Sequence, residues 1–401
     1  RLGGLIRGVT VVDPACGSGS FLVGMMNILF DLRQRAAAQI GVAHTANEAK
    51  REIIGYNLYG VDVMQWAVEI AELRLWLQLV VHTELEPGEL QGPRPLLPNL
   101  SFKIRQGDSL VQEVAGVNLA HLKTDVTVPT NLRGRLRKLQ DHKLAFYEAK
   151  EHYSPEAEDE IRKEERKLFL DILHHKATAL EQQVQRIAAR LGERQRRIDG
   201  TEEDAASPEE RRELEQQREQ VEAQLESVGQ AHAAILKAKQ VPFVWDLAFV
   251  EIFEGDTRGF DIVIGNPPYV RQERIADPEV PLSEQSKEGR ACYKAALERS
   301  VYAAYPSYFG RDPGRPRVKL SGRSDLYVYF YFHALSLLND RGVFCFITSN
   351  SWLDVGYGAA LQEFLARQVP IHLILDNQVK RSFAQADVNT VIALFDAPNN
   401  K

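Results

Sequence analysis

The chain has 401 residues, of which 44% are hydrophobic and 26% charged, values typical of a soluble globular protein with one large domain or two. It contains no apolar run long enough to cross a membrane, and its three cysteines are too few and too scattered for a disulfide framework or a zinc site, so we expect a reduced, cytoplasmic setting. The net charge of -6 does not favour nucleic acid in general, so any DNA contact is expected from local basic surface.

The first part of the chain, residues 1–130, alternates short strands with helices. Strands are expected at Gly8–Asp13, Asn57–Asp62 and Phe102–Arg105, and helices at Phe21–Gln39 and Met64–His82. Strands that alternate with helices are typical of a parallel sheet covered by helices on both faces. We therefore expect an α/β core to begin here.

Residues 131–240 differ in composition, because they are rich in Glu, Lys, Arg, Gln and Ala and contain almost no Gly or Pro. Two sets of apolar residues recur at helical or heptad spacing, and Ser207-Pro208-Glu209-Glu210 is typical of a helix start. This pattern predicts two long antiparallel helices that form an inserted coiled-coil arm. The arm is either a solvated spacer or a surface that touches DNA or a partner. The apolar positions are Leu173, Ala177, Leu180, Val184, Ile187, Leu191 and Ile198, then Leu214, Val221, Leu225, Val228 and Ile235.

The α/β pattern resumes in residues 241–401. The expected strands complete a mostly parallel sheet of seven, and the last two are expected to pair as an antiparallel edge. The stretch between Tyr269 and Asp325 has weak periodicity, so it is expected to be a long functional or mobile loop. The expected strands are Phe260–Gly265, Val343–Thr348, His372–Leu375 and Thr390–Phe395, and the expected helices are Asp325–Asn339 and Ala359–Gln368.

Three carboxylates end the first three strands. Gly17 and Gly19 form a turn after the first strand, and glycine lets the backbone approach a ligand closely. Asp13, Asp62 and Asp108 follow adjacent strands at one edge of the sheet, where open α/β folds bind ligands. We expect a nucleoside-type cofactor there, with Asp62 on the ribose hydroxyls and Asp108 on an adenine amino group.

A nicotinamide dinucleotide is not favoured as this cofactor. Its fingerprint requires a third glycine three residues after Gly19, and that position is Leu22. The pattern therefore favours a nucleoside-type cofactor other than a nicotinamide dinucleotide.

The tetrapeptide Asn266-Pro267-Pro268-Tyr269 directly follows an expected strand. The Asn266 side-chain oxygen and the Pro267 carbonyl are two acceptors that suit the two hydrogens of a planar exocyclic amine. Two consecutive prolines fix the backbone, so these acceptors need no reorganisation. Tyr269 offers an aromatic face on which a base can stack.

The two motifs, in this order and each after a strand, resemble motifs I and IV of the DNA amino-methyltransferases. Their order is similar to the gamma class, most of all to the fused type IIG restriction–modification enzymes and the BREX-type phage-defence methyltransferases. The resemblance covers essentially all of the chain outside the arm. It implies a Rossmann-like fold that binds S-adenosylmethionine and methylates the N6 amine of a flipped-out adenine in a restriction–modification or phage-defence system.

The resemblance also implies roles for individual residues. Asn266, Pro267, Pro268 and Tyr269 are then catalytic, and Tyr269 and Phe383 stack on the target base, although Phe383 also suits a core position in the last hairpin. No step demands a metal. The implied cofactor-binding residues are Asp13, Pro14, Ala15, Gly17, Gly19, Phe21, Asp62, Val63, Asp108, Ser109, Leu110, Asn266, Asp325 and Leu326.

Basic residues near the tetrapeptide and in the stretch from 311 to 323 are the best candidates for contact with DNA. Phosphate contacts of this kind give affinity without reading sequence, and a solubilising loop is the alternative. These residues are Arg271, Arg274, Arg311, Arg315, Arg317, Lys319 and Arg323.

The chain opens on Arg1 and reaches its first motif within a few residues, so we read it as a piece of a longer protein. The expected partners are double-stranded DNA, an N-terminal region with motif X, a target-recognition domain and other defence proteins. A methyltransferase of RNA or of a protein glutamine amide stays open at this point, as does a non-catalytic subunit that binds S-adenosylmethionine or DNA for specificity or sensing.

Overall fold

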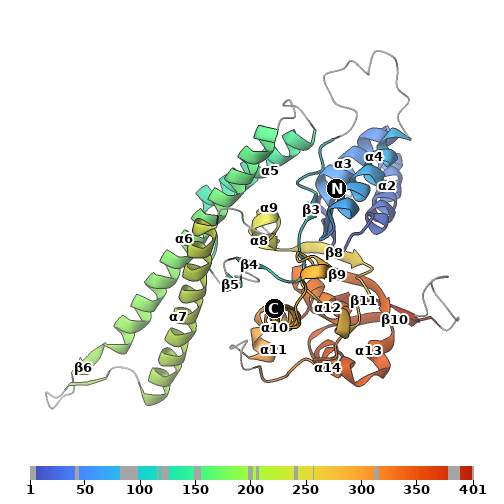
Figure 1. Ribbon diagram of the computed structural model, residues 1–401. Helices are drawn as coiled ribbons and strands as arrows, with labels where there is room; N and C mark the ends of the chain where they lie inside the picture. Colours follow the sequence, from blue (N-terminus) through green and yellow to red (C-terminus); the bar gives the residue numbers. More distant parts are fainter. Residues whose placement is uncertain are drawn as a thin grey trace.

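The computed structural model of the protein describes residues 6–40, 45–81, 98–114, 117–118, 126–148, 155–196, 202–204, 207–238, 243–255, 257–310, 316–377 and 389–399. An α/β core is built on one large sheet, and long helices extend from one side of this core as an arm (Figure 1). None of the described helices is long and apolar enough to span a membrane.

The large sheet has seven strands in the order β10-β11-β9-β8-β1-β2-β3. The pairings from β3 through β2, β1 and β8 to β9 are parallel, whereas β11 is antiparallel to both β9 and β10. The sheet is therefore mixed, and the antiparallel pairing expected for the last two strands is confirmed. The strands are β1 (Val11–Asp13), β2 (Leu58–Asp62), β3 (Ile104–Gln106), β8 (Phe260–Gly265), β9 (Leu338–Ser349), β10 (Ile371–Asp376) and β11 (Thr390–Asp396).

Helices cover the two faces of this sheet, because successive side chains of a strand point to opposite faces. The core helices are α2 (Ser20–Ile40), α3 (Ala46–Asn57), α4 (Gln65–Val80), α8 (Trp245–Ala248), α9 (Val250–Phe253), α10 (Lys287–Ala304), α11 (Pro306–Phe309), α12 (Leu326–Leu337), α13 (Ser351–Asp354) and α14 (Ala359–Gln368). A two-stranded ribbon, β4 (Glu113–Val114) with β5 (Val117–Asn118), lies outside the large sheet.

Each face has its own apolar core. Val12, Val263 and Phe344 belong to a core shared with α8, α9, α10, α12 and α14, whereas Val11 and Leu58 belong to a core shared with α2, α3 and α4. The second core ends near the middle of the sheet.

Beyond that point, on the same face as Val11, the outer strands carry apolar side chains that the described helices leave exposed. Leu373 and Leu375 of β10 are 41% and 50% exposed, and Ile392 of β11, which lies opposite Leu375, is 39% exposed.

Several expected elements differ from those found. The strand expected from Gly8 begins only at Val11, because residues 6–8 are helical. The expected loop between Tyr269 and Asp325 contains the long helix α10, whose first turn is capped by the Ser286 side chain. The helix expected to reach Asn339 ends at Leu337, since the following residues already pair in β9.

The described part of the arm contains three helices, α5 (Thr130–Tyr147), α6 (Pro155–Leu191) and α7 (Pro208–Lys237). The two long antiparallel helices expected are α6 and α7, which run side by side in opposite directions, and α5 is an additional helix (Figure 1). All the expected apolar positions up to Leu191, and all those in α7, belong to one shared core. Helix α6 ends at Leu191, because the chain next forms the hairpin β6 (Arg194–Arg196) and β7 (Glu202–Asp204); Ile198 lies outside the described residues. The coiled-coil packing itself stays a prediction.

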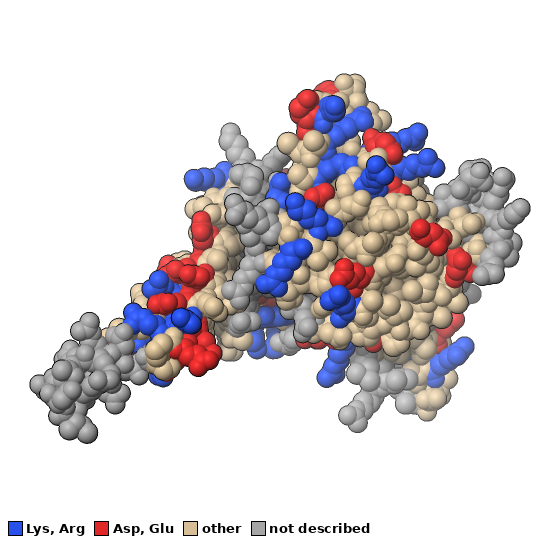
Figure 2. Space-filling model, turned by 90° about the horizontal axis from the view of Figure 1, so that it is seen from below, with Lys and Arg blue, Asp and Glu red and all other residues tan. Residues whose placement is uncertain are grey.

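The outer surface of the arm is highly charged. On the face seen in Figure 2, basic and acidic side chains lie interspersed along it. Within α7, Arg211 pairs with Glu215 four residues further on, and both side chains are exposed to solvent. Pairs of this kind are typical of a solvated helix face.

A buried ionic cluster attaches the base of the arm to the edge of the sheet. Glu165 of α6 pairs with Arg105 of β3 and with Lys143 of α5, and Lys143 also pairs with Glu251 of α9. All four side chains are at most 6% exposed. Burial also lowers the pKa of the neighbouring Lys103 to about 7, and its ammonium lies over the ring of Tyr59. Removing Glu165 would leave the buried Arg105 without its paired carboxylate and Lys143 with Glu251 alone, so the cluster fixes the arm firmly.

The Glu165→Gln variant tests this attachment. It should lower the free energy of unfolding by about 3 kcal/mol, because Arg105 and Lys143 lose their shared anion in a buried position. Urea unfolding followed by tryptophan fluorescence measures this change. The matched control is Glu164→Gln, at the preceding residue of the helix, which bonds the exposed His142 and should change stability by less than about 0.5 kcal/mol. Equal effects of the two substitutions would show that the cluster does not hold the arm.

Candidate functional site

The carboxyl ends of three neighbouring strands meet at one edge of the sheet. Asp13 ends β1, Asp62 ends β2, and Asn266 directly follows β8. Because β1 pairs in parallel with both β2 and β8, these residues lie at the same edge. Two motifs that are far apart in the sequence are thus brought together where open α/β sheets bind ligands.

The glycine turn after β1 is fixed against Asp62. Gly17 and Gly19 have φ angles of 51° and 76°, a region that favours glycine. The Gly17 amide donates to Asp62 Oδ2 at 2.9 Å, and the Met64 amide donates to Oδ1 at 2.9 Å. A Cβ atom on Gly19 would lie 3.0 Å from the Cβ of Ala71, whereas a Cβ on Gly17 would meet no atom within 4 Å. The turn is therefore packed at Gly19 and open at Gly17.

Asp13 is a buried carboxyl between the turn and β8. It is 1% exposed, and its Oδ1 accepts from the Ala15 amide at 3.0 Å. A Cβ atom on Gly265 would lie 2.7 Å from the same oxygen, so glycine is required there for this close approach. Burial raises the pKa of Asp13 to about 7, and the charge of Asp62 adds to this shift. A positive charge placed beside Asp13 would favour its ionised form.

Asp108 is held by three hydrogen bonds just after β3. Its Oδ1 accepts from the amides of Leu110 and Val111 at 2.8 and 3.3 Å. Its Oδ2 accepts from the hydroxyl of Tyr293 at 2.7 Å. Burial raises the pKa of Asp108 to about 6, although these hydrogen bonds oppose the shift. The carboxyl therefore has a fixed orientation at the third strand end.

Other residues expected at the cofactor pocket support the turn. The Ser109 hydroxyl donates to the carbonyl of Pro14, and the Trp245 indole donates to the Ser109 carbonyl at 3.0 Å. Leu110 is buried in the core, and Phe21 is half-buried at the start of α2. Ser109 therefore links the strand ends of β1 and β3.

The Asn-Pro-Pro-Tyr segment leaves β8 with its polar atoms ordered. The Tyr269 hydroxyl donates to Asn266 Oδ1 at 2.7 Å, and its oxygen also lies 3.3 Å from the Ile347 carbonyl. Burial raises the pKa of Tyr269 to about 12, so the phenol is neutral and able to donate at ordinary pH. Pro267 is buried and Pro268 exposed. Tyr269 thus orients the asparagine amide in addition to offering an aromatic face.

Asp325 and Leu326, expected beside the cofactor, contact the loop that follows the tetrapeptide. The Leu326 amide donates to the Val270 carbonyl at 3.0 Å, and Asp325 Oδ1 accepts from the Gln272 amide at 2.9 Å. The Tyr357 hydroxyl lies 3.3 Å from Asp325 Oδ2. These contacts stabilise the start of α12 against the loop.

A hollow of about 370 Å³ is lined by Tyr269, Val270, Arg271 and Arg274 of this segment. Lys294 of α10 joins the two expected basic segments, because its ammonium contacts Gln272 Oε1 at 3.1 Å and the Gly322 carbonyl at 3.0 Å.

The basic residues of both segments are exposed where the structure describes them. Arg271, Arg274, Arg317, Lys319 and Arg323 are exposed, whereas Arg311, Arg315 and Phe383 lie outside the described residues.

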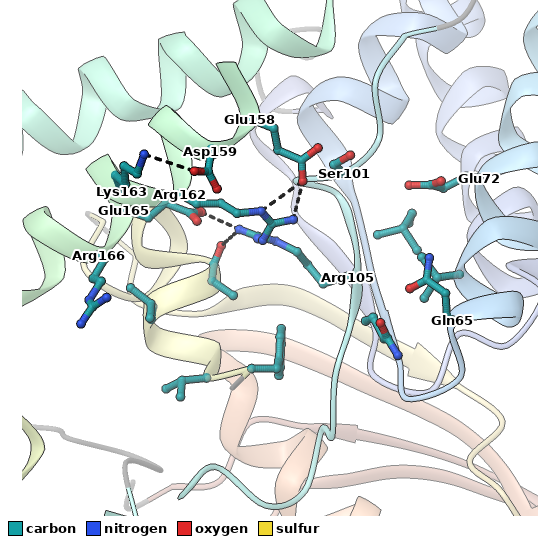
Figure 3. A pocket seen from close by; sticks show the side chains of 17 residues that line it. Gln65, Glu72, Ser101, Arg105, Glu158, Asp159, Arg162, Lys163, Glu165 and Arg166 are labelled. Atoms are coloured by element: carbon teal, nitrogen blue, oxygen red, sulfur yellow. Dashed lines mark hydrogen bonds and ion pairs between the residues drawn. The ribbon is translucent and has the colours of Figure 1, made fainter. Parts of the chain in front are cut away.

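A larger cavity of about 730 Å³ lies between β3, α4 and the base of the arm (Figure 3). Arg105 and Glu165 meet in it, and Arg162 pairs there with Glu158. Neither the three aspartates nor the tetrapeptide lines it, so it is separate from the strand-end site.

The sequence patterns did not lead us to predict α10 or a role for its Tyr293. The signal was present, because Tyr293, Leu297, Ser300 and Ala304 recur at helical spacing after the capping residue Ser286. The contact with Asp108 depends on tertiary packing and has no local signature.

Substituting Asp13 with Asn tests the burial of this carboxyl. The pKa of Asp13 rises from 3.8 in the unfolded chain to about 7 in the folded protein. The folded protein therefore becomes less stable as the pH rises from about 4 to about 7. The Asp13→Asn variant should therefore unfold at a higher temperature than the native chain above pH 7, with an advantage of at most about 4 kcal/mol that shrinks toward pH 4. Thermal unfolding at several pH values without added ligand measures this difference, and the exposed Asp340→Asn is the control. A difference that does not depend on pH would contradict the assignment.

The sequence matches the profile of the Eco57I restriction-modification methylase family over residues 56–307 and 314–383. The protein RM.MjaORFECS2P of Methanocaldococcus jannaschii is 35% identical over 130 residues, 31% of this chain and 11% of that protein. The type II methyltransferase M.BstVI of Geobacillus stearothermophilus is 32% identical over 117 residues, 29% of this chain and 16% of that protein. The aligned parts of this chain thus span less than a fifth of either relative.

Among solved structures, the chain is similar to a nuclease-deletion mutant of the Type ISP restriction-modification enzyme LlaGI in complex with a DNA substrate mimic. The TM-score is 0.42 and the sequence identity 13%, and the match covers 98% of this chain and 21% of that chain. The Type IIL enzyme MmeI in complex with DNA is similar at a TM-score of 0.38 and 14% identity, over 100% and 32%. Because the family profile covers most of its length, the chain belongs to the Eco57I restriction-modification methylase family.

Proposed function

We propose that this chain is the catalytic core of a DNA methyltransferase that takes a methyl group from S-adenosylmethionine and transfers it to the N6 amine of a flipped-out adenine, within a restriction–modification system. Membership of the methylase family supports the broad activity. One observation carries the finer proposal. The Asn266–Tyr269 segment begins at the strand end where Gly265 adjoins the Asp13 carboxyl, which is itself beside the Gly17–Gly19 turn.

The residues at the strand ends fit S-adenosylmethionine. The open space at Gly17 allows close approach of a ligand, the buried Asp13 suits a positively charged group, and Asp62 and Asp108 are acceptors for hydroxyl and amino groups. The cofactor supplies a methyl group bonded to a positively charged sulfur, and the sulfur keeps the electrons of the broken carbon–sulfur bond. We assign its binding to Asp13, Pro14, Ala15, Gly17, Gly19, Phe21, Asp62, Val63, Asp108, Ser109 and Leu110, with Asn266, Asp325 and Leu326 at the border of the pocket.

The tetrapeptide would then act on the target amine. Asn266 Oδ1 and the Pro267 carbonyl accept its two hydrogens and favour a tetrahedral nitrogen whose lone pair is free to form the new bond. The Tyr269 hydroxyl uses one lone pair of Asn266 Oδ1, which leaves another for the amine. Two prolines and the buried position of Pro267 keep the carbonyl fixed, so catalysis is positioning and electrostatic stabilisation. The methylated nitrogen releases a proton to solvent.

Double-stranded DNA is the proposed substrate of the whole protein. The exposed Arg271, Arg274, Arg317, Lys319 and Arg323 suit contacts with phosphates, and we extend this role to Arg311 and Arg315. Tyr269 and Phe383 are the proposed stacking partners of the flipped base. We further propose a cytoplasmic setting, and sequence recognition by parts of the protein outside these 401 residues or by partner subunits.

Removing the amide acceptor should abolish methylation. With Asn266→Ala in the full-length protein, methylation of adenine N6 should fall by at least about 100-fold, the usual effect of losing one fixed polar group in an active site. Single-molecule sequencing of genomic DNA from cells that express each variant measures this. Asn47→Ala on α3, which bonds the Leu79 carbonyl far from the strand ends, is the control and should retain activity. If the unmodified protein with its partners leaves genomic adenine unmethylated, the proposal is wrong.

The salt dependence of DNA binding tests the basic segment. Each of Arg271→Gln and Arg274→Gln should reduce the slope of log affinity against log salt concentration by about 1, because one phosphate contact is lost. Titration of labelled duplex DNA at several salt concentrations gives the slope. Arg367→Gln on α14, whose side chain pairs with Glu363, is the control and should leave the slope unchanged. Identical slopes in all variants would exclude these arginines from the DNA interface.

A further inference from the structure

We propose that Tyr293 of α10 is a positioning residue that gives the cofactor pocket its selectivity for a 6-aminopurine over a 6-oxopurine, by holding the Asp108 carboxylate as an acceptor. The inference rests on the proposed function, since it concerns the adenine end of the same cofactor. It adds a residue from the part of the chain that follows the Asn-Pro-Pro-Tyr segment, whereas the other residues assigned to the purine come from before the arm.

Among the described residues, the hydrogen bonds to Asp108 leave one acceptor position. An ionised carboxylate has about four lone-pair positions. Two on Oδ1 are used by the amides of Leu110 and Val111, and one on Oδ2 by Tyr293. The remaining lone pair of Oδ2 is available to a ligand donor such as an exocyclic amino group. Rotation of the carboxylate would break the three existing bonds, so its direction is fixed.

Tyr293 can act only as a donor in this contact. Burial raises the pKa of its phenol well above the usual value, and the nearby acids Asp108, Asp277 and Glu279 add to the shift. The phenol therefore keeps its proton and donates it to Asp108. This hydrogen bond also lowers the pKa of Asp108 against the effects of burial and of Glu279, which favours the acceptor form.

Loss of the tyrosine hydroxyl would change what Asp108 offers to a purine. Without this bond the pKa of Asp108 rises, since desolvation is then opposed only by the two backbone amides. The protonated fraction of Asp108 then increases, and a protonated carboxyl presents a hydroxyl that suits a 6-oxo group and does not suit a 6-amino group. The residue therefore affects discrimination between two ligands as well as overall affinity.

Helix α10 is rigidly placed for this role. Seven residues after Tyr293, the Ser300 hydroxyl donates to the carbonyl of Leu110 at 2.8 Å, so the helix is bound to the strand-end segment at two points. Leu297 and Val301 of the same helix pack in the core with Leu110. The ammonium of Lys294, the residue after Tyr293, donates to the Gln272 side chain and to the Gly322 carbonyl. One helix thus contacts both the expected purine end and the loop after the tetrapeptide.

The test compares two ligands that differ at position 6 of the purine and in the hydrogen that the 6-oxo form carries on the neighbouring N1. Dissociation constants for S-adenosylhomocysteine and S-inosylhomocysteine are measured by isothermal titration calorimetry on the full-length protein, on Tyr293→Phe and on Tyr302→Phe. Tyr302 is a matched control, because it is a buried tyrosine of the same helix whose hydroxyl oxygen accepts from the Leu320 amide.

We expect Tyr293→Phe to bind S-adenosylhomocysteine about tenfold more weakly and S-inosylhomocysteine as well as or better than the native protein does, so that selectivity collapses. Tyr302→Phe should keep the native selectivity. Equal weakening of both ligands by Tyr293→Phe would indicate a merely structural role and overturn the inference, as would unchanged affinities. If the native protein binds neither ligand, the proposed cofactor is wrong. If the native protein is selective and Tyr293→Phe keeps that selectivity, only the role of Tyr293 is wrong.

Discussion

The parallel pairing of β1 with β8 is the constraint on which the site depends. These strands are separated by the whole arm in sequence, yet their register sets Asp13 against Gly265 and so joins the glycine turn to the Asn-Pro-Pro-Tyr segment. Asp261 secures the opposite ends of the strands, because its carboxylate accepts from the amide and hydroxyl of Thr10 and from the side chain of Asn339. A slip of one residue would turn every side chain of β8 to the other face.

The position of the arm explains how such a long insertion is tolerated. The chain leaves the sheet after β3, its edge strand, and returns to the middle of the sheet in β8. No strand pairing is interrupted, because the insertion departs where pairing has already ended. The buried ionic cluster of Arg105, Lys143, Glu165 and Glu251 then fixes the arm to that edge. Breaking one of its ion pairs would leave a charge buried without a partner, which costs much free energy.

Local sequence patterns identified most of the sheet and the residues at its strand ends. Apolar runs followed by glycine or aspartate mark β1, β2 and β8 clearly, since buried parallel strands require them. Helix α10 was not predicted, although its later turns carry residues at helical spacing, because its first turn, Lys287–Arg290, holds no apolar side chain. The hydrogen bonds from Tyr293 to Asp108 and from Tyr269 to Asn266 were equally hidden. They depend on how elements pack in three dimensions, and one-dimensional periodicity carries no information about that.

The exposed apolar side chains of Leu373, Leu375 and Ile392 have a practical consequence for handling the protein. They lie on β10, the outermost strand of the sheet, and on its neighbour β11. An edge strand offers backbone groups for further pairing, and apolar side chains beside it strengthen any such contact. Purified as these 401 residues alone, the protein has a surface suited to concentration-dependent self-association. Lysine in place of Leu373 or Leu375 is the substitution by which natural edge strands avoid that behaviour.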